Sequence, residues 1–390
     1  MNNPKTILII GGSFGSIQAA WTLRHLLDEK HRISIISDKP KTIFRASFPR
    51  VIFENLDPEK ITMDLSENFK NTGIEFICDP MLSVDQNNNK VLCENNEYQF
   101  DYLILATGVR HDYEAIPGLQ EFGLSVCDPS GILETRETLL NFESGNFFAG
   151  VGSGFTPCDG PPMEIIMNLH HLLSEKGKRN DVQLNFITDK GKLLPPGGPK
   201  IVKYLDEHFT KNNINIYLNV ELIKLDKDTL YFKDGTTMPY DICLLVPPYR
   251  GIHELEDSDL TDERGFVPVD SKNMLATDSR NKNIYAVGDC MGNPGPKQGH
   301  LAFIQATVAA EHIAWKINQT GTVRLYQPEF KCVMDQGGGI GLYLYSQHMS
   351  GGDGLKIELG EEPYKSKIKF EEIFMDKKGD IGQLYHQMAK

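Results

Sequence analysis

The chain contains 390 residues, enough for two or three packed domains, and 40% of them are hydrophobic, as in an ordinary soluble α/β protein. Its formal net charge of −13 would repel a phosphate backbone, so nucleic acid is not an expected partner. No run reaches the ~18 apolar residues of a membrane-spanning helix, and no basic and apolar leader precedes the first predicted strand. We therefore expect a protein that resides on the cytoplasmic side of a membrane.

Seven cysteines are scattered along the chain, and no two of them form a Cys-x-x-Cys pair. Neither a disulfide framework nor a metal site is expected from such spacing. In a reducing compartment, cysteines that the fold brings together are expected to be catalytic. The cysteines stand at positions 78, 93, 127, 158, 243, 290 and 332.

Strand-like and helix-like runs alternate in two series along the chain. Each series has the βαβ rhythm of a parallel sheet, which predicts an α/β fold with two Rossmann-like dinucleotide-binding units. The first series has strands at 6–10 and 33–37 around a helix at 17–27. The second series has strands at 147–151 and 183–188 and helices at 163–173 and 201–211.

The character of the sequence changes beyond about residue 321. Two strands, 331–335 and 341–346, are predicted around a glycine turn at 337–339. Residues 365–390 then carry six lysines against four acidic residues. We predict two short amphipathic helices here that dock on an anionic membrane surface. Their apolar residues at helical spacing are Phe370, Ile373 and Phe374, followed by Ile381, Leu384, Tyr385 and Met388.

A glycine-rich turn follows the first predicted strand and opens a helix. Gly11, Gly12, Ser13 and Gly15 would let the backbone approach a pyrophosphate at the helix N-terminus. Alone this is a weak signal, because serines replace two of the usual glycines. Asp38 strengthens it, since an acidic residue at the end of the second strand can bind both ribose hydroxyls.

Two later strand ends carry the motifs Ala106-Thr107-Gly108 and Gly288-Asp289. Both resemble strand ends of the two-dinucleotide-domain flavoprotein superfamily, which has the glutathione-reductase-like fold. The resemblance implies FAD as the cofactor. It implies that Asp289 holds the ribityl chain and that Met81 binds adenine through its backbone. It also implies that a helix beginning near residue 300 points its positive end at the flavin, and it assigns Lys39 and Pro49 to the same site.

The second unit differs from that of the superfamily's NADH-using members. Its loop, residues 150–164, is lengthened, contains three prolines and carries Cys158. Proline has no N–H to bind a phosphate, so NADH binding is expected to be impaired. Residues 43–49 also lack the Cys-x4-Cys pair of the disulfide reductases, which excludes a glutathione-reductase type.

The Cys158 loop, with its Gly-Pro-Pro and the later Glu164, resembles that of sulfide:quinone oxidoreductases and flavocytochrome c sulfide dehydrogenases. Cys127, Cys158 and Cys332 match the three cysteines of the quinone reductases, and Lys297 matches a lysine beside the flavin. The likeness spans nearly the whole chain. It departs from the family pattern at Ser13, Ser16 and Gln298.

The resemblance implies an enzyme that oxidises sulfide to polysulfide at a Cys158/Cys332 pair, with Cys127 passing sulfur outward and a membrane quinone as electron acceptor. Expected domains are 1–109 with 265–322 for FAD, 110–264 for the second Rossmann-like unit, and 323–390 for a C-terminal region with membrane contact. Glu164 could relay protons, although a structural role is favoured. No role is expected for Cys78, Cys93, Cys243 and Cys290, which are interpreted as buried structural cysteines.

Three other interpretations remain open at this stage. One is an NADH:quinone oxidoreductase, and another is a flavocytochrome c-like enzyme that passes electrons to a protein. The third is a flavoprotein without catalytic activity. The oligomeric state is also open, with a homo-oligomer among the options.

Overall fold

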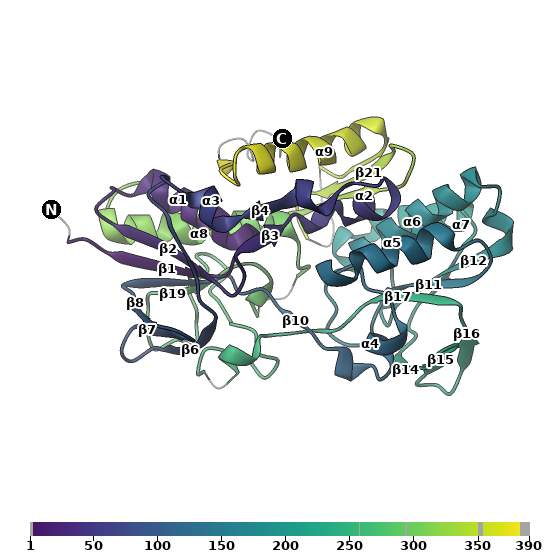
Figure 1. The fold of residues 1–390 in the computed structure, drawn as a ribbon, viewed down its shortest axis with the longest axis horizontal. Coiled ribbons are helices and arrows are strands. Elements are labelled where there is room, and N and C mark those ends of the chain that lie inside the picture. The colour runs from purple at the N-terminus through teal and green to yellow at the C-terminus, as the bar shows by residue number, and fades with distance from the viewer. Residues whose placement is uncertain (1–2, 257, 293–294, 350–353, 383–390) are drawn as a thin grey trace.

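The computed structural model describes residues 3–256, 258–292, 295–349 and 354–382. Two parallel sheets form the centres of two lobes that lie side by side (Figure 1). The strand order is β19-β9-β1-β2-β5 in the first sheet and β13-β12-β11-β17 in the second. The predicted α/β fold with two Rossmann-like units is therefore confirmed.

The first lobe is built on strands with continuous apolar runs, which are covered from both sides. In β1, Ile7 to Ile10 are all buried, since α1 and α8 pack together above the sheet and a small antiparallel sheet lies below it (Figure 1). Its elements are β1 (Thr6–Ile10), β2 (Arg32–Ser37), β5 (Glu75–Cys78), β9 (Tyr102–Leu105), β19 (Ile284–Ala286), α1 (Phe14–Leu26), α8 (Gly299–Asn318), β6 (Met81–Asp85), β7 (Lys90–Cys93) and β8 (Glu97–Gln99).

The second lobe repeats this plan around β11, which is buried from Phe147 to Val151. Helices lie above its sheet and an antiparallel three-stranded sheet lies below (Figure 1). Its elements are β11 (Gly145–Val151), β12 (Val182–Ile187), β13 (Ile214–Tyr217), β17 (Ile242–Val246), α5 (Ile132–Asn141), α6 (Gly160–Glu175), α7 (Pro199–Lys211), α4 (Leu119–Phe122), β14 (Leu222–Leu225), β15 (Thr229–Phe232) and β16 (Thr237–Pro239).

Short elements join the lobes. The antiparallel pair β10 and β18 lies in the chain segments that cross between them (Figure 1), and α2 contacts both α5 and α6. These elements are β10 (Arg110–His111), β18 (Tyr249–Arg250) and α2 (Phe48–Phe53). The remaining short elements belong to the first lobe, where α3 contacts β5; they are β3 (Lys41–Ile43), β4 (Thr62–Asp64) and α3 (Leu65–Phe69).

The C-terminal region contains β20 (Phe330–Asp335), β21 (Gly341–Ser346), β22 (Lys356–Gly360) and α9 (Glu361–Asp376). The predicted hairpin is confirmed, and Gly337, Gly338 and Gly339 in its turn all have positive φ. The third strand, β22, was not predicted. Helix α6 begins at Gly160, three residues earlier than predicted, because a helix tolerates Pro161 and Pro162 in its first turn. The domain limits given above stay a prediction.

Helix α9 corrects part of the membrane prediction. Its apolar stripe does form a helix, but Phe374 is only 1% exposed and packs against Phe14, Phe44 and Phe303. Ile381 is buried as well. These side chains are covered by the protein's own core, so they are not available to lipid. Leu384, Tyr385 and Met388 lie outside the described residues. Among the helices of the described chain, none is both long and apolar enough to span a bilayer.

Candidate active site

A cavity of about 1180 Å³ lies at the junction of the two lobes, and α9 lines part of it with Ser366, Lys367 and Phe370. Sixteen of the seventeen predicted site residues line this cavity, although they come from nine separate stretches of sequence. They are Gly11, Gly12, Ser13, Gly15, Asp38, Lys39, Pro49, Ala106, Thr107, Gly108, Cys127, Cys158, Gly288, Asp289, Lys297 and Cys332.

Met81 is the predicted residue that does not line the cavity. It is buried at the start of β6, where it pairs with Cys93 of β7. A hydrophobic side chain placed in this antiparallel sheet is held in the core, and its role at adenine stays a prediction.

The glycine turn brings backbone close to backbone. A Cβ on Gly11, which has φ +122°, would lie 2.2 Å from the carbonyl oxygen of Ala106. A Cβ on Gly15 would lie 3.2 Å from Val287, where α1 approaches the end of β19. Ser16 is accommodated because its hydroxyl donates to the Ser13 carbonyl at 2.8 Å. The turn therefore keeps its close backbone packing despite the two serines, and its role at a pyrophosphate stays a prediction.

The N-terminus of α8 also opens into the cavity. This helix has 20 residues, and its N-cap residue Gln298 makes no capping hydrogen bond with its side chain. The Gln298 side-chain oxygen Oε1 is buried and has no hydrogen-bond partner among the described residues. A buried acceptor beside free helix N–H groups fits a polar heteroaromatic ring with its own N–H donor. The residues present thus fit a flavin.

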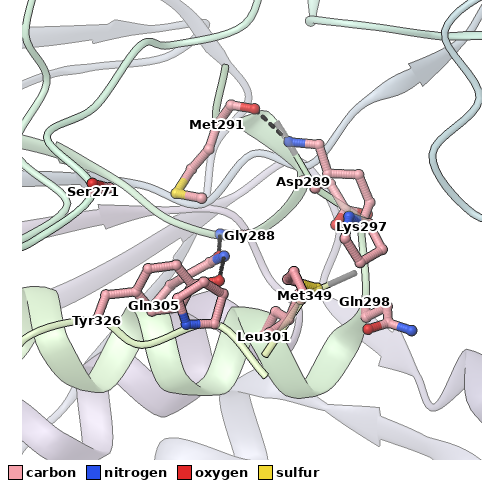
Figure 2. A pocket seen from close by; sticks show the side chains of 13 residues that line it. Ser271, Gly288, Asp289, Met291, Lys297, Gln298, Leu301, Gln305, Tyr326 and Met349 are labelled. Carbon is pink, nitrogen blue, oxygen red and sulfur yellow. Dashed lines mark hydrogen bonds between the residues drawn. The ribbon is translucent and has the colours of Figure 1, made fainter. Parts of the chain in front are cut away.

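Two hydrogen bonds hold the residues on either side of Asp289, one at Gly288 and one at Met291 (Figure 2). Gln305 of α8 accepts from the Gly288 N–H at 2.8 Å and donates to the Tyr326 hydroxyl at 3.1 Å, which fixes the turn that carries Asp289. Burial raises the pKa of Asp289, and the cations Lys297 and Arg45 oppose that rise. Lys297 is itself buried, donates to the Met291 carbonyl, and has a pKa lowered by its burial.

The structure brings Cys127, Cys158 and Cys332 to the same cavity. Cys158 lies in the loop before α6, and a Cβ built on Gly160 would lie 3.7 Å from the Cys332 sulfur. Cys332 lies in the middle of β20. The first turn of α6 packs against its sulfur. Only tertiary structure could place these two thiols together, because 173 residues separate them along the chain, positions 159 to 331.

All three thiols are protonated at neutral pH in this environment. Burial raises the pKa of Cys127 to about 12 and that of Cys332 to about 12, and it raises the pKa of Cys158 well above its ordinary value. The carboxylates of Asp289 and Asp159 add to this rise in the pKa of Cys158, as would a thiolate at Cys127 or Cys332. Two or three thiolates at once are therefore disfavoured in this cavity.

A buried ion pair stands beside Cys332. Lys367 of α9 pairs with Glu164 of α6, and the Asp335 N–H donates to the same Glu164 oxygen at 2.7 Å. The Glu164 charge raises the pKa of Cys332 and the Lys367 charge lowers it. The structural role expected for Glu164 is thus present, since it joins α6, β20 and α9. Its proximity to a reactive thiol was not visible in the sequence.

Arg45, His111 and Tyr249 also line the cavity and were not singled out in the sequence. Tyr249 is hydrogen-bonded to Cys127 and so lowers the pKa of that thiol. Burial and the nearby Arg45 lower the pKa of His111 to about 4, so this imidazole is neutral at pH 7. A single Arg, His or Tyr in a short strand or loop carries no motif, and no sequence signal could have selected these three.

The cysteines without an expected role include one correction. Cys93, Cys243 and Cys290 are buried as expected, but Cys78 is exposed. Cys78 is the last residue of β5, which is the edge strand of the first sheet, and this position leaves its side chain exposed. Within the described ranges, no cluster of three or more His, Cys, Asp or Glu residues is arranged to hold a metal ion.

Residues 5–310 match the family of pyridine nucleotide-disulphide oxidoreductases. This chain belongs to that family. Family membership and the relatives below together imply a flavin cofactor.

Three individual comparisons show which members of the family this chain resembles. The chain is 27% identical to the sulfide-quinone reductase of Aquifex aeolicus, over 95% of this chain and 90% of that protein. It is 22% identical to the mitochondrial sulfide:quinone oxidoreductase of Mus musculus, over 86% of this chain and 76% of that protein. Its fold matches the crystal structure of the A. aeolicus sulfide:quinone oxidoreductase with a TM-score of 0.88 at 24% identity, over 96% of this chain and 92% of the other. The resemblance stated from the sequence is confirmed.

Proposed function

We propose that this chain is an FAD-dependent sulfide:quinone oxidoreductase that forms polysulfide or zero-valent sulfur at Cys158 and Cys332. Its similarity to the A. aeolicus and mouse enzymes supports the activity. One observation carries the proposal in the structure. Three cysteines from distant segments line the same cavity as the glycine turn and the N-terminus of α8.

The FAD would be held by groups that lie apart from the cysteines. The turn of Gly11, Gly12, Ser13 and Gly15 would take the pyrophosphate at the start of α1, and Asp38 with Lys39 would take the ribose. Other contacts would come from Pro49 and from the strand ends at Ala106, Thr107, Gly108 and Gly288, with Asp289 at the ribityl chain. When bound, FAD supplies a two-electron acceptor that quinone can reoxidise.

The cysteines would perform the sulfur chemistry by exchange. Sulfide attacks a Cys158–Cys332 disulfide at the Cys158 sulfur; that S–S bond breaks, a persulfide remains on Cys158, and Cys332 leaves as a thiolate. The thiolate carries the electron pair that the reaction releases. Lys367 and the N-terminus of α6 both lie where they stabilise this negative charge. Cys127, which shares the cavity, would take over the lengthening sulfur chain.

Several finer points belong to the same proposal. The electron acceptor would be a membrane quinone, with the protein attached peripherally on the cytoplasmic side. Because Phe374 and Ile381 are buried, attachment would rest on surfaces other than the inner face of α9. A homo-oligomer is compatible with this arrangement.

NADH is a less suitable electron donor on the present geometry. Pro161 and Pro162 occupy the first turn of α6, where a second pyrophosphate would need backbone N–H groups. The loop that carries Cys158 occupies the place of that pyrophosphate. A flavocytochrome c-like acceptor differs in needing a protein partner, and Cys127 favours the quinone type.

Anaerobic titration with sulfide tests the proposal. Sulfide should bleach the visible absorbance of the bound flavin, and a soluble quinone should restore it. NADH at the same concentration should leave the flavin oxidised. Bleaching by NADH and not by sulfide would overturn the proposed activity.

A further inference from the structure

The loop that carries Cys158 is fixed by two residues that the sequence did not select. Asp189 and Lys190 lie two and three residues after the end of β12, the second strand of the second Rossmann-like unit. Asp189 accepts from the Gly154 N–H at 2.9 Å. Lys190 donates from Nζ to the Thr156 carbonyl at 2.7 Å and pairs with Asp159. All three contacts therefore tie the loop to the segment that follows β12.

The Lys190–Asp159 pair is well shielded from water. The Asp159 side chain is 5% exposed and the Lys190 side chain 25% exposed. Burial raises the pKa of Asp159, and the charge and hydrogen bond of Lys190 oppose that rise. Removing one partner of a buried pair leaves an uncompensated charge and is costly. These two side chains therefore strongly restrain the residue next to Cys158.

Other groups hold the opposite side of the loop. The Tyr249 N–H donates to the Phe155 carbonyl at 2.8 Å, and the Lys297 N–H donates to the Pro157 carbonyl at 3.2 Å. The Arg264 guanidinium lies 4.4 Å from the centre of the Phe155 ring. The loop is thus held between the Asp189–Lys190 segment and the wall of the cavity, with the thiol of Cys158 turned into the cavity.

Asp189 and the Gly154 loop occupy the positions that bind a dinucleotide in other units of this fold. In dinucleotide-binding units, an acidic residue at the end of the second strand binds the ribose, and the loop after the first strand binds the pyrophosphate. Asp189 and the Gly154 loop stand at those two positions here, and they are bonded to each other. The groups that would bind a second dinucleotide therefore bind each other instead.

We propose that Lys190 and Asp189 are positioning residues, which hold the 154–159 loop so that Cys158 faces Cys332, and that the second dinucleotide site of the fold has been converted into this clamp. The inference deepens the proposed function and rests on it. The clamp acts through the loop backbone and Asp159, and neither Lys190 nor Asp189 reacts with sulfur.

The test measures the reactivity of each cysteine in the flavin-loaded, reduced protein. Iodoacetamide labelling is followed by mass spectrometry at Cys158, Cys332 and Cys127 separately. Lys190→Met should speed labelling of Cys158 about tenfold, within the range of coupling energies for contacting residues, because the freed loop exposes the thiol. Labelling of Cys332 should stay within about twofold of the unmodified protein. Lys190→Arg should restore the slow rate, since it keeps the charge and the donors.

The control variant is Lys192→Met, which removes the same charge from an exposed position two residues away. It should change none of the three rates. The double variant Lys190→Met with Asp159→Asn should accelerate labelling of Cys158 no more than Lys190→Met alone, because it also removes the carboxylate that the single variant leaves uncompensated. If Lys190→Met does not fold, Asp189→Ala removes the hydrogen bond to Gly154 while leaving the Lys190–Asp159 pair in place, and it should give a smaller acceleration at Cys158.

Sulfide-driven quinone reduction is measured on the same samples. The clamp predicts a lower turnover in Lys190→Met with flavin still bound, and full recovery in Lys190→Arg. Equal Cys158 labelling in Lys190→Met and the unmodified protein would overturn the clamp even if sulfide oxidation is active. A changed Cys158 rate in a protein that does not oxidise sulfide would instead uphold the clamp and reject the proposed function.

Discussion

Arg50 of α2 donates to Glu371 of α9 through a hydrogen bond of 2.7 Å that joins positions 321 residues apart. The Ser47 hydroxyl donates to the same carboxylate, which is only 9% exposed in its side chain. This pair places the inner face of α9 over the cavity, where Phe370 and Phe374 meet the aromatic residues of the first lobe. The C-terminal helix is therefore part of the site.

Phe374→Ala is expected to destabilise the protein by about 3–5 kcal/mol, as for other large-to-small changes of buried aromatic residues. Phe374 is fully buried and packs against four other aromatic rings. Urea unfolding monitored by circular dichroism measures the loss. Phe374→Leu, which keeps most of the volume, should cost much less. Equal stability of Phe374→Ala and the unmodified protein would mean that α9 does not pack as described.

Cys158→Ser and Cys332→Ser should each abolish sulfide-driven quinone reduction while flavin stays bound. The exchange reaction needs both sulfurs, whereas the flavin is held by separate groups. Cys127→Ser should slow turnover only moderately, because this residue is assigned to sulfur transfer. Cys78→Ser is the matched control, since Cys78 is exposed at a sheet edge, and should have no effect. Retention of most activity in either of the first two variants would contradict the assigned chemistry.

The labelling rate of Cys332 should rise steeply with pH. Its pKa is raised to about 12, so at pH 7 to 10 the thiolate fraction grows about tenfold for each pH unit without levelling off. Glu164→Gln removes a negative charge that raises this pKa and should accelerate labelling. Lys367→Met removes a positive charge that lowers it and should slow labelling. A plateau below pH 9, or the opposite order of the two variants, would contradict this account.

Lys297→Ala should make the flavin harder to reduce, because a cation beside the site of developing negative charge is lost. A shift of the midpoint potential by roughly −30 mV corresponds to about 1.4 kcal/mol for a two-electron couple. Spectroelectrochemical titration measures the potential directly. Lys297→Arg should retain most of the effect if the charge is responsible. An unchanged potential in the alanine variant would mean that Lys297 acts only through its bond to the Met291 carbonyl.

Membrane attachment is best tested with a truncation that spares α9. A cut at residue 366 would remove Lys367, Phe370 and Phe374, which line the cavity or fill the core. Deletion of residues 383–390 should preserve bleaching of the flavin by sulfide and reduce sedimentation with anionic liposomes. Vesicles of neutral lipid serve as the control for charge. Undiminished sedimentation of the truncated protein would place the anchor elsewhere.

The sequence by itself was sufficient for the local features of the fold. The βαβ runs, the glycine turn at residues 11–15 and the strand ends at Gly108 and Asp289 depend on backbone geometry over a few residues, so their patterns are readable directly. The hairpin turn at residues 337–339 belongs to the same class. The cysteines were selected through resemblance, because three scattered thiols carry no local pattern.

Tertiary structure decided which groups meet. It placed Cys332 at the first turn of α6, with Glu164 and Lys367 beside it. It also paired Lys190 with Asp159. These residues lie far apart in the sequence, and no sequence pattern predicts that they are in contact. It also determined what covers the apolar face of α9. Helical periodicity shows that one face is apolar but not what covers it, and burial against Phe14, Phe44 and Phe303 gives the same pattern as burial in lipid.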